Sequence, residues 1–135
     1  MIDEILNVAK ELWSIRQTFN KAKQDKREKM ATYFENISSC LEQASATLRG
    51  GEIPHGKCGQ MLGYARMFPE TVEGVISEEK AEEFTSKLIE AHGIEHATKI
   101  GEKEFADAVY SDQQIGKIEE ASGQFQALAD SIRAI

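Results

Sequence analysis

The chain has 135 residues, and its 16 Lys or Arg against 23 Asp or Glu give a formal net charge of −7. Hydrophobic residues make up 41% and charged residues 29%, which excludes a wholly disordered chain, and no stretch approaches the roughly 20 apolar residues of a membrane span. Because the acidic start lacks the basic-then-apolar layout of a secretion signal, we expect a single cytoplasmic domain over residues 1–135.

The first segment is a stretch of 49 residues without glycine or proline, since all 10 glycines and both prolines lie at or after Gly50. Its apolar residues recur at steps of three, four and seven, which is typical of a helix with one side facing a partner. The three rows are Ile5, Leu12, Phe19, Tyr33 and Cys40; Leu6, Trp13, Phe34, Leu41 and Leu48; and Ile2, Ala9, Met30, Ile37 and Ala44.

These rows keep their phase across the charged stretch Lys21–Lys29, which favours one long helix from about Ile2 to Leu48. At 1.5 Å per residue that helix would be roughly 70 Å long, about twice the width of a compact domain of this size. The alternative is a tight hairpin, because Asp25 and Glu28 have the spacing of a capping box that starts a second helix.

The remaining chain predicts shorter helices. Gly50-Gly51 ends the first helix, and Pro54 begins a second that stops before Pro69. Three glycines weaken that second helix or let it pack unusually close to a neighbour: Gly56, Gly59 and Gly63.

Ser77 caps a third helix that runs towards Ala91. The last helical pattern spans about Lys103 to Arg133. No strand pattern is present. The fold class is therefore all-α, an elongated bundle of about four helices with a long first helix that needs a partner along part of its length.

Charge is divided unevenly along the chain. Residues 1–50 carry 8 basic and 7 acidic side chains, whereas residues 51–135 carry 8 and 16. The basic stretch offers Lys21, Lys23, Lys26 and Arg27 as candidate binding residues, but it contains acids and no aromatic, which disfavours nucleic acid as a partner. A solvated helix face fits better, as does a contact with the acidic run Glu70–Glu83, within one molecule or across an interface.

The histidines give one catalytic-looking pattern. His92, Glu95 and His96 match H-x-x-E-H, in which two imidazoles and a glutamate serve a zinc ion. Gly93 interrupts the required helix, and the chain lacks the sheet of a peptidase. We therefore expect no catalytic residues, no bound metal and no cofactor, and keep a small metal- or ligand-binding protein as the alternative function.

The two cysteines favour packing over reactivity. Cys40 lies on an apolar row, where a free cysteine behaves as a small hydrophobe. Cys58 lies three residues after His55, so a thiol–imidazole pair can be imagined, but a core position is the better interpretation.

One stretch resembles a known module. Lys26-Arg27-Glu28-Lys29, then Tyr33-Phe34, Ile37 and Cys40-Leu41, and then Pro54-His55-Gly56-Lys57-Cys58 read like the helical amino-terminal module of bacterial multidomain signalling and defence effectors, over about residues 20–75. The resemblance implies a non-enzymatic module that recruits a protein partner or self-associates as a homo-oligomer, and it adds His55, Gly56 and Lys57 as candidate binding residues. The predicted function is thus a protein–protein interaction or oligomerisation module.

Overall fold

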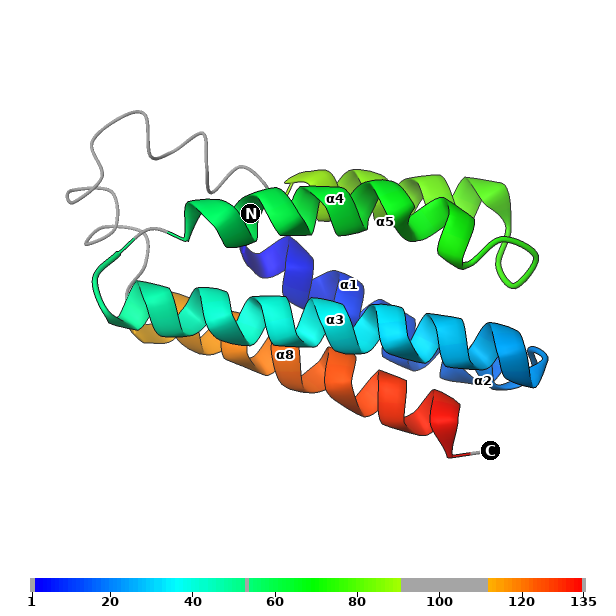
Figure 1. Cartoon of the computed structure of the whole chain (residues 1–135). Helices are drawn as coiled ribbons and strands as arrows, with labels where there is room; N and C mark the ends of the chain where they lie inside the picture. Colours follow the sequence, from blue (N-terminus) through cyan, green and yellow to red (C-terminus); the bar gives the residue numbers. More distant parts are fainter. Residues whose placement is uncertain (1, 53, 91–111, 135) are drawn as a thin grey trace.

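The computed structural model describes residues 2–52, 54–90 and 112–134, and these residues lie in helices joined by short turns (Figure 1). No strand occurs in this part of the chain, so the all-α prediction is confirmed. In chain order the helices are α1 (Ile2–Ser14), α2 (Arg16–Asn20), α3 (Gln24–Arg49), α4 (His55–Thr71), α5 (Glu78–Glu90) and α8 (Asp112–Arg133).

The predicted long first helix is wrong, because the chain turns back at residues 21–23. The turn lets Phe19 of α2 pack edge-to-face on Phe34 of α3, with ring centroids 5.6 Å apart. The apolar rows on both sides of the turn face the same core, so their common phase reflects shared burial rather than one continuous helix. The hairpin alternative is confirmed.

Helix α3 does not begin as a capping box would start it. Its N-cap residue is Lys23, which makes no side-chain cap hydrogen bond, and Asp25 lies inside the first turn. An acid there is favourable because the amino end of a helix carries partial positive charge. With 26 residues, α3 is about 39 Å long at 1.5 Å per residue, so the need for a partner that we derived from a 70 Å helix disappears.

Helices α3 and α8 pack against each other along most of their lengths and run antiparallel (Figure 1). Both helices bury small or apolar residues at a seven-residue spacing, which are Ala31, Ser38 and Ser45 on α3 and Ile115, Ser122 and Ala129 on α8. The hydroxyl of Ser38 donates to the main-chain oxygen of Ser122 and the hydroxyl of Ser122 donates to that of Ser38, both at 2.8 Å. Small, mutually bonded side chains let the two helices approach closely.

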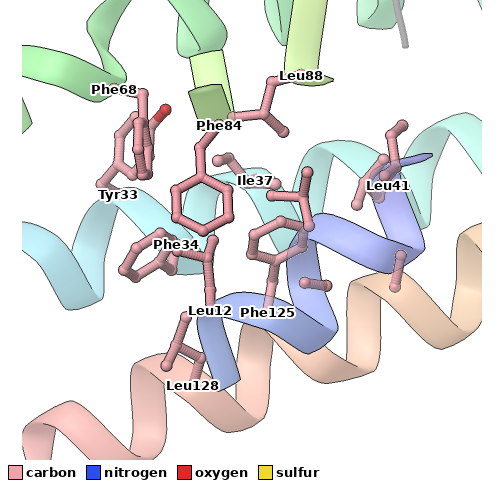
Figure 2. Packing of buried hydrophobic residues seen from close by; sticks show 14 of the residues in the cluster. Leu12, Tyr33, Phe34, Ile37, Leu41, Phe68, Phe84, Leu88, Phe125 and Leu128 are labelled. Atoms are coloured by element: carbon pink, nitrogen blue, oxygen red, sulfur yellow. The ribbon is translucent and has the colours of Figure 1, made fainter. Parts of the chain in front are cut away.

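Helices α4 and α5 form a hairpin that covers the other side of α3 and α1 (Figure 1). Figure 2 shows Phe68 of α4 and Phe84 and Leu88 of α5 reaching toward Tyr33, Phe34 and Leu12 below them. The rings of Phe68 and Phe84 lie 5.9 Å apart, edge-to-face. The apolar core therefore runs without interruption from α8 through α3 to the hairpin.

Two predictions about the hairpin have different outcomes. Ser77 does cap α5, since its hydroxyl accepts a hydrogen bond from the main-chain N–H of Lys80 at 3.2 Å. Helix α4, in contrast, does not stop before Pro69 but continues through it to Thr71. Pro69 lacks the N–H that would bond the main-chain oxygen of Ala65, and only two residues of the helix follow it.

The glycines of α4 have no close packing neighbour in the part of the chain that the structure describes. A Cβ atom added at Gly56, Gly59 or Gly63 would meet nothing within 4 Å. The predicted stop of the preceding helix is confirmed, because α3 ends at Arg49 and Gly51 adopts a φ of 82° that favours glycine. None of the helices among the described residues is long and apolar enough to cross a membrane.

Candidate functional site

A groove of about 570 Å³ lies between α3 and α4, and we call it the α3–α4 groove. Its lining residues are Lys26, Glu28, Lys29, Thr32, Tyr33 and Asn36 on α3 and Tyr64, Met67, Glu70 and Thr71 on α4.

Two tyrosines form the aromatic part of this lining. Tyr33 and Tyr64 meet edge-to-face with ring centroids 6.0 Å apart, and Tyr33 also contacts Phe68 at 6.2 Å. The hydroxyl of Tyr33 donates a hydrogen bond to the main-chain oxygen of Tyr64. Burial, reinforced by the neighbouring Tyr64, raises the pKa of Tyr33 above its ordinary value of 10. The phenol therefore stays protonated and holds α4 against α3 rather than acting as a base.

Apolar surface is exposed at the rim of the groove. The side chain of Met67 is 51% exposed, and it is one of two large hydrophobic residues left open in the described part of the chain. Methionine is flexible and polarizable and adapts to partners of different shape. An exposed methionine above an aromatic surface offers a contact for an apolar side chain from outside.

Among the predicted basic residues, Lys26 lines this groove and Arg27 lines neither the groove nor the hollow beside it. A second hollow of about 500 Å³ is lined by Lys21, Lys23, Lys26 and Glu73, together with Thr18, Ala22, Gly74 and Val75. Lys26 lines both hollows, and its ammonium donates to the main-chain oxygen of Glu70 at 3.5 Å. The start of the acidic run thus meets the basic stretch within one molecule.

The other predicted binding residues lie elsewhere. His55, Gly56 and Lys57 form the first turn of α4, beside Cys40 on α3. Cys40 is 14 residues from Lys26 along α3, which corresponds to about 21 Å. The structure therefore separates the two predicted groups and places only the basic one at the groove.

Contacts at the first turn of α4 are structural. The ammonium of Lys57 donates to the side-chain oxygen of Gln60 at 3.1 Å, and the Cys40 thiol donates to the main-chain oxygen of Lys57 at 3.4 Å. Burial raises the pKa of the Cys40 thiol, and the charge of Lys57 opposes this more weakly. A buried, protonated thiol is a poor nucleophile, so the core interpretation of Cys40 is confirmed.

The remaining candidates are outside the structural description. His92, Glu95 and His96 all lie outside the described residues, and so does the side chain of Cys58. Within the described ranges, no group of three or more His, Cys, Asp or Glu side chains could hold a metal ion.

Several groove residues were not identified from the sequence. Asn36, Tyr64 and Met67 line the groove without belonging to the rows that indicate burial. The available signal was position on the helix, since Tyr64 lies beside the buried row of Met61, Ala65 and Phe68 rather than within it. Such flanking residues line the edge of a helix contact, but a sequence does not say which helix they flank.

The chain was compared with protein-family models, with curated proteins and with solved structures. None of the three comparisons finds a match. Function is therefore inferred from the geometry of the groove.

Proposed function

We propose that this chain is a non-enzymatic protein–protein interaction module and that the α3–α4 groove docks a helix of a protein partner. The observation that carries the proposal is the groove itself, in which exposed Met67 stands beside the Tyr33–Tyr64 pair. A hollow between two helices fits the apolar face of a third helix, which is a recurring mode of recognition.

The charges around the groove indicate the chemistry of the partner. Lys26 and Lys29 stand on the α3 rim, and Lys21 and Lys23 continue the positive charge into the neighbouring hollow. Glu28 lies on the same rim but is engaged by Arg133 of α8 at 3.6 Å. The complementary ligand is an amphipathic helix with carboxylates along the edge that faces α3, because opposite charges set orientation and accelerate association.

Two further features support a non-enzymatic role. The buried hydroxyl of Tyr33 and the buried thiol of Cys40 both have raised pKa values and both donate to main-chain oxygens. Neither group supplies a base or a nucleophile at neutral pH.

The resemblance of residues 20–75 to an amino-terminal module of bacterial effectors points to the same role. Lys26, Lys29 and Tyr33 belong both to the residues that carry this resemblance and to the groove. An adaptor role in a bacterial signalling or defence system is therefore part of the proposal.

Asn36→Glu tests the proposal, because Asn36 is exposed and lines the groove, and a carboxylate there repels the carboxylates of the proposed partner. Asn7→Glu on the exposed side of α1 is the matched control, since it adds the same side chain outside the groove. Wild-type chain and the control should capture the same partner, and Asn36→Glu should lose it. Equal capture by both variants, or a partner without an acidic amphipathic helix, would contradict the proposal.

A further inference from the structure

The hollow beside the α3–α4 groove concentrates positive charge. Here called the basic hollow, it has a volume of about 500 Å³, and its charged lining residues are Lys21, Lys23, Lys26 and Glu73. Three ammonium groups against one carboxylate leave the lining with a formal net charge of +2. A concave surface lined mainly by one sign of charge focuses its field on a ligand of the opposite sign, so the basic hollow favours an anion.

The position of the basic hollow relates it to the groove. Lys26 lines both. From there the groove follows α3 towards Asn36, whereas the basic hollow continues back to the turn of residues 21–23. This turn and the α4–α5 turn lie at one end of the bundle, and the described ends Glu90 and Asp112 lie toward the other (Figure 1). A helix docked in the groove therefore presents one of its ends to the basic hollow.

We infer that the basic hollow binds a phosphorylated side chain at one end of the helix docked in the α3–α4 groove, so that phosphorylation of the partner regulates docking. The inference rests on the proposed function. A phosphoryl group carries a charge of about −1.5 to −2 at neutral pH, which matches the lining, whereas one carboxylate neutralises half of it. Lysine binds phosphate as a point charge, and the hydroxyl of Thr18 adds a donor to the lining.

The exposure of the lysines sets the expected strength. Lys21 and Lys23 are exposed, so water and salt screen each contact with the phosphate. The docked helix compensates, because it holds the phosphate at a high effective concentration beside the lysines. Phosphorylation should therefore tighten docking about tenfold, and free phosphate at micromolar concentration should not compete.

Fluorescence anisotropy with a labelled synthetic peptide tests the inference. The peptide is an amphipathic helix of about 16 residues, with leucines on one face and glutamates along one edge. It is made without phosphate, with phosphoserine at its amino end, and with phosphoserine at its carboxyl end. Wild-type chain should bind the peptide without phosphate and one of the two phosphopeptides about tenfold more tightly. The other phosphopeptide is the matched control, because its phosphate lies at the far end of the groove.

Two double variants locate the phosphate. Lys21→Gln with Lys23→Gln should remove the gain, because both residues line the basic hollow. Neither lines the groove, so binding of the peptide without phosphate should change by less than about twofold. Lys10→Gln with Lys80→Gln removes the same charge from two exposed lysines elsewhere and should keep the gain.

The outcomes separate this inference from the proposed function. If the peptide without phosphate binds and Asn36→Glu weakens it, but neither phosphate tightens binding, the inference is wrong and the proposed function stands. The inference is also overturned by a gain that survives in Lys21→Gln/Lys23→Gln, by an equal gain from both phosphopeptides, or by displacement with micromolar inorganic phosphate. If none of the peptides binds the wild-type chain, the inference and the proposed function are both wrong.

Discussion

Helices α3 and α4 lie side by side but differ in glycine content and in burial. Helix α3 has 26 residues without a glycine and is buried against α8 on one side and α4 on the other. Helix α4 has 17 residues with three exposed glycines and a proline, and it buries one row. The difference indicates a division of labour in which α3 supplies most of the buried contacts, and in the proposed function α4 supplies surface for a partner.

The largest expected effect is on the core side of α3. Phe34 is fully buried and contacts the rings of Phe19, Tyr33 and Phe125 at 5.5–6.1 Å. Phe34→Ala should lower the free energy of unfolding by about 3–5 kcal/mol, because the buried ring leaves a cavity. Urea unfolding monitored by circular dichroism measures this change.

Met67→Ala on α4 is the matched truncation on an exposed side chain. It should change the free energy of unfolding by less than about 0.5 kcal/mol, measured in the same urea titration. If Met67→Ala lowered the free energy of unfolding nearly as much as Phe34→Ala, the side chain of Met67 would belong to the core. The division of labour between α3 and α4 would then be wrong.

A smaller effect, of opposite sign on the two helices, comes from exchanging glycine and alanine. Gly63→Ala on α4 should stabilise the fold by about 0.5–1 kcal/mol, because alanine favours the helix and its Cβ meets nothing. Ala46→Gly on the exposed side of α3 should destabilise it by a similar amount. Thermal unfolding at a few micromolar compares both variants with wild type. If Gly63→Ala destabilises the fold, the space beside Gly63 is packed and is not open.

The same contrast explains what the sequence could predict. Burial has a period, so the rows through Phe19, Phe34 and Leu41 predicted helices and core correctly. A turn made of lysine and alanine has no such signal, and the chain reversal at residues 21–23 was hidden because helices on both sides of it face one core. The candidate site was predicted only at Lys21, Lys23 and Lys26, since Asn36 and Tyr64 become neighbours only once α4 lies beside α3.

The smallest expected effect concerns an ion pair between α3 and α8. The guanidinium of Arg133 donates a hydrogen bond to the carboxylate of Glu35, and this bond and its charge lower the pKa of Glu35 below its ordinary value of 4.5. A carboxyl whose pKa is lower in the folded state adds stability above its unfolded pKa and loses it as pH falls through the folded one.

Wild-type stability should therefore decline from pH 6 to pH 3 more steeply than that of Glu35→Gln, as measured by urea midpoints across this range. The effect is modest because both side chains are partly exposed to solvent. Arg133→Gln removes the cause of the shift, so adding Glu35→Gln to it should flatten the profile no further. If the two substitutions flatten the profile additively, groups other than Arg133 lower the pKa of Glu35. The Glu35–Arg133 pair would then not be the contact that links α3 to α8.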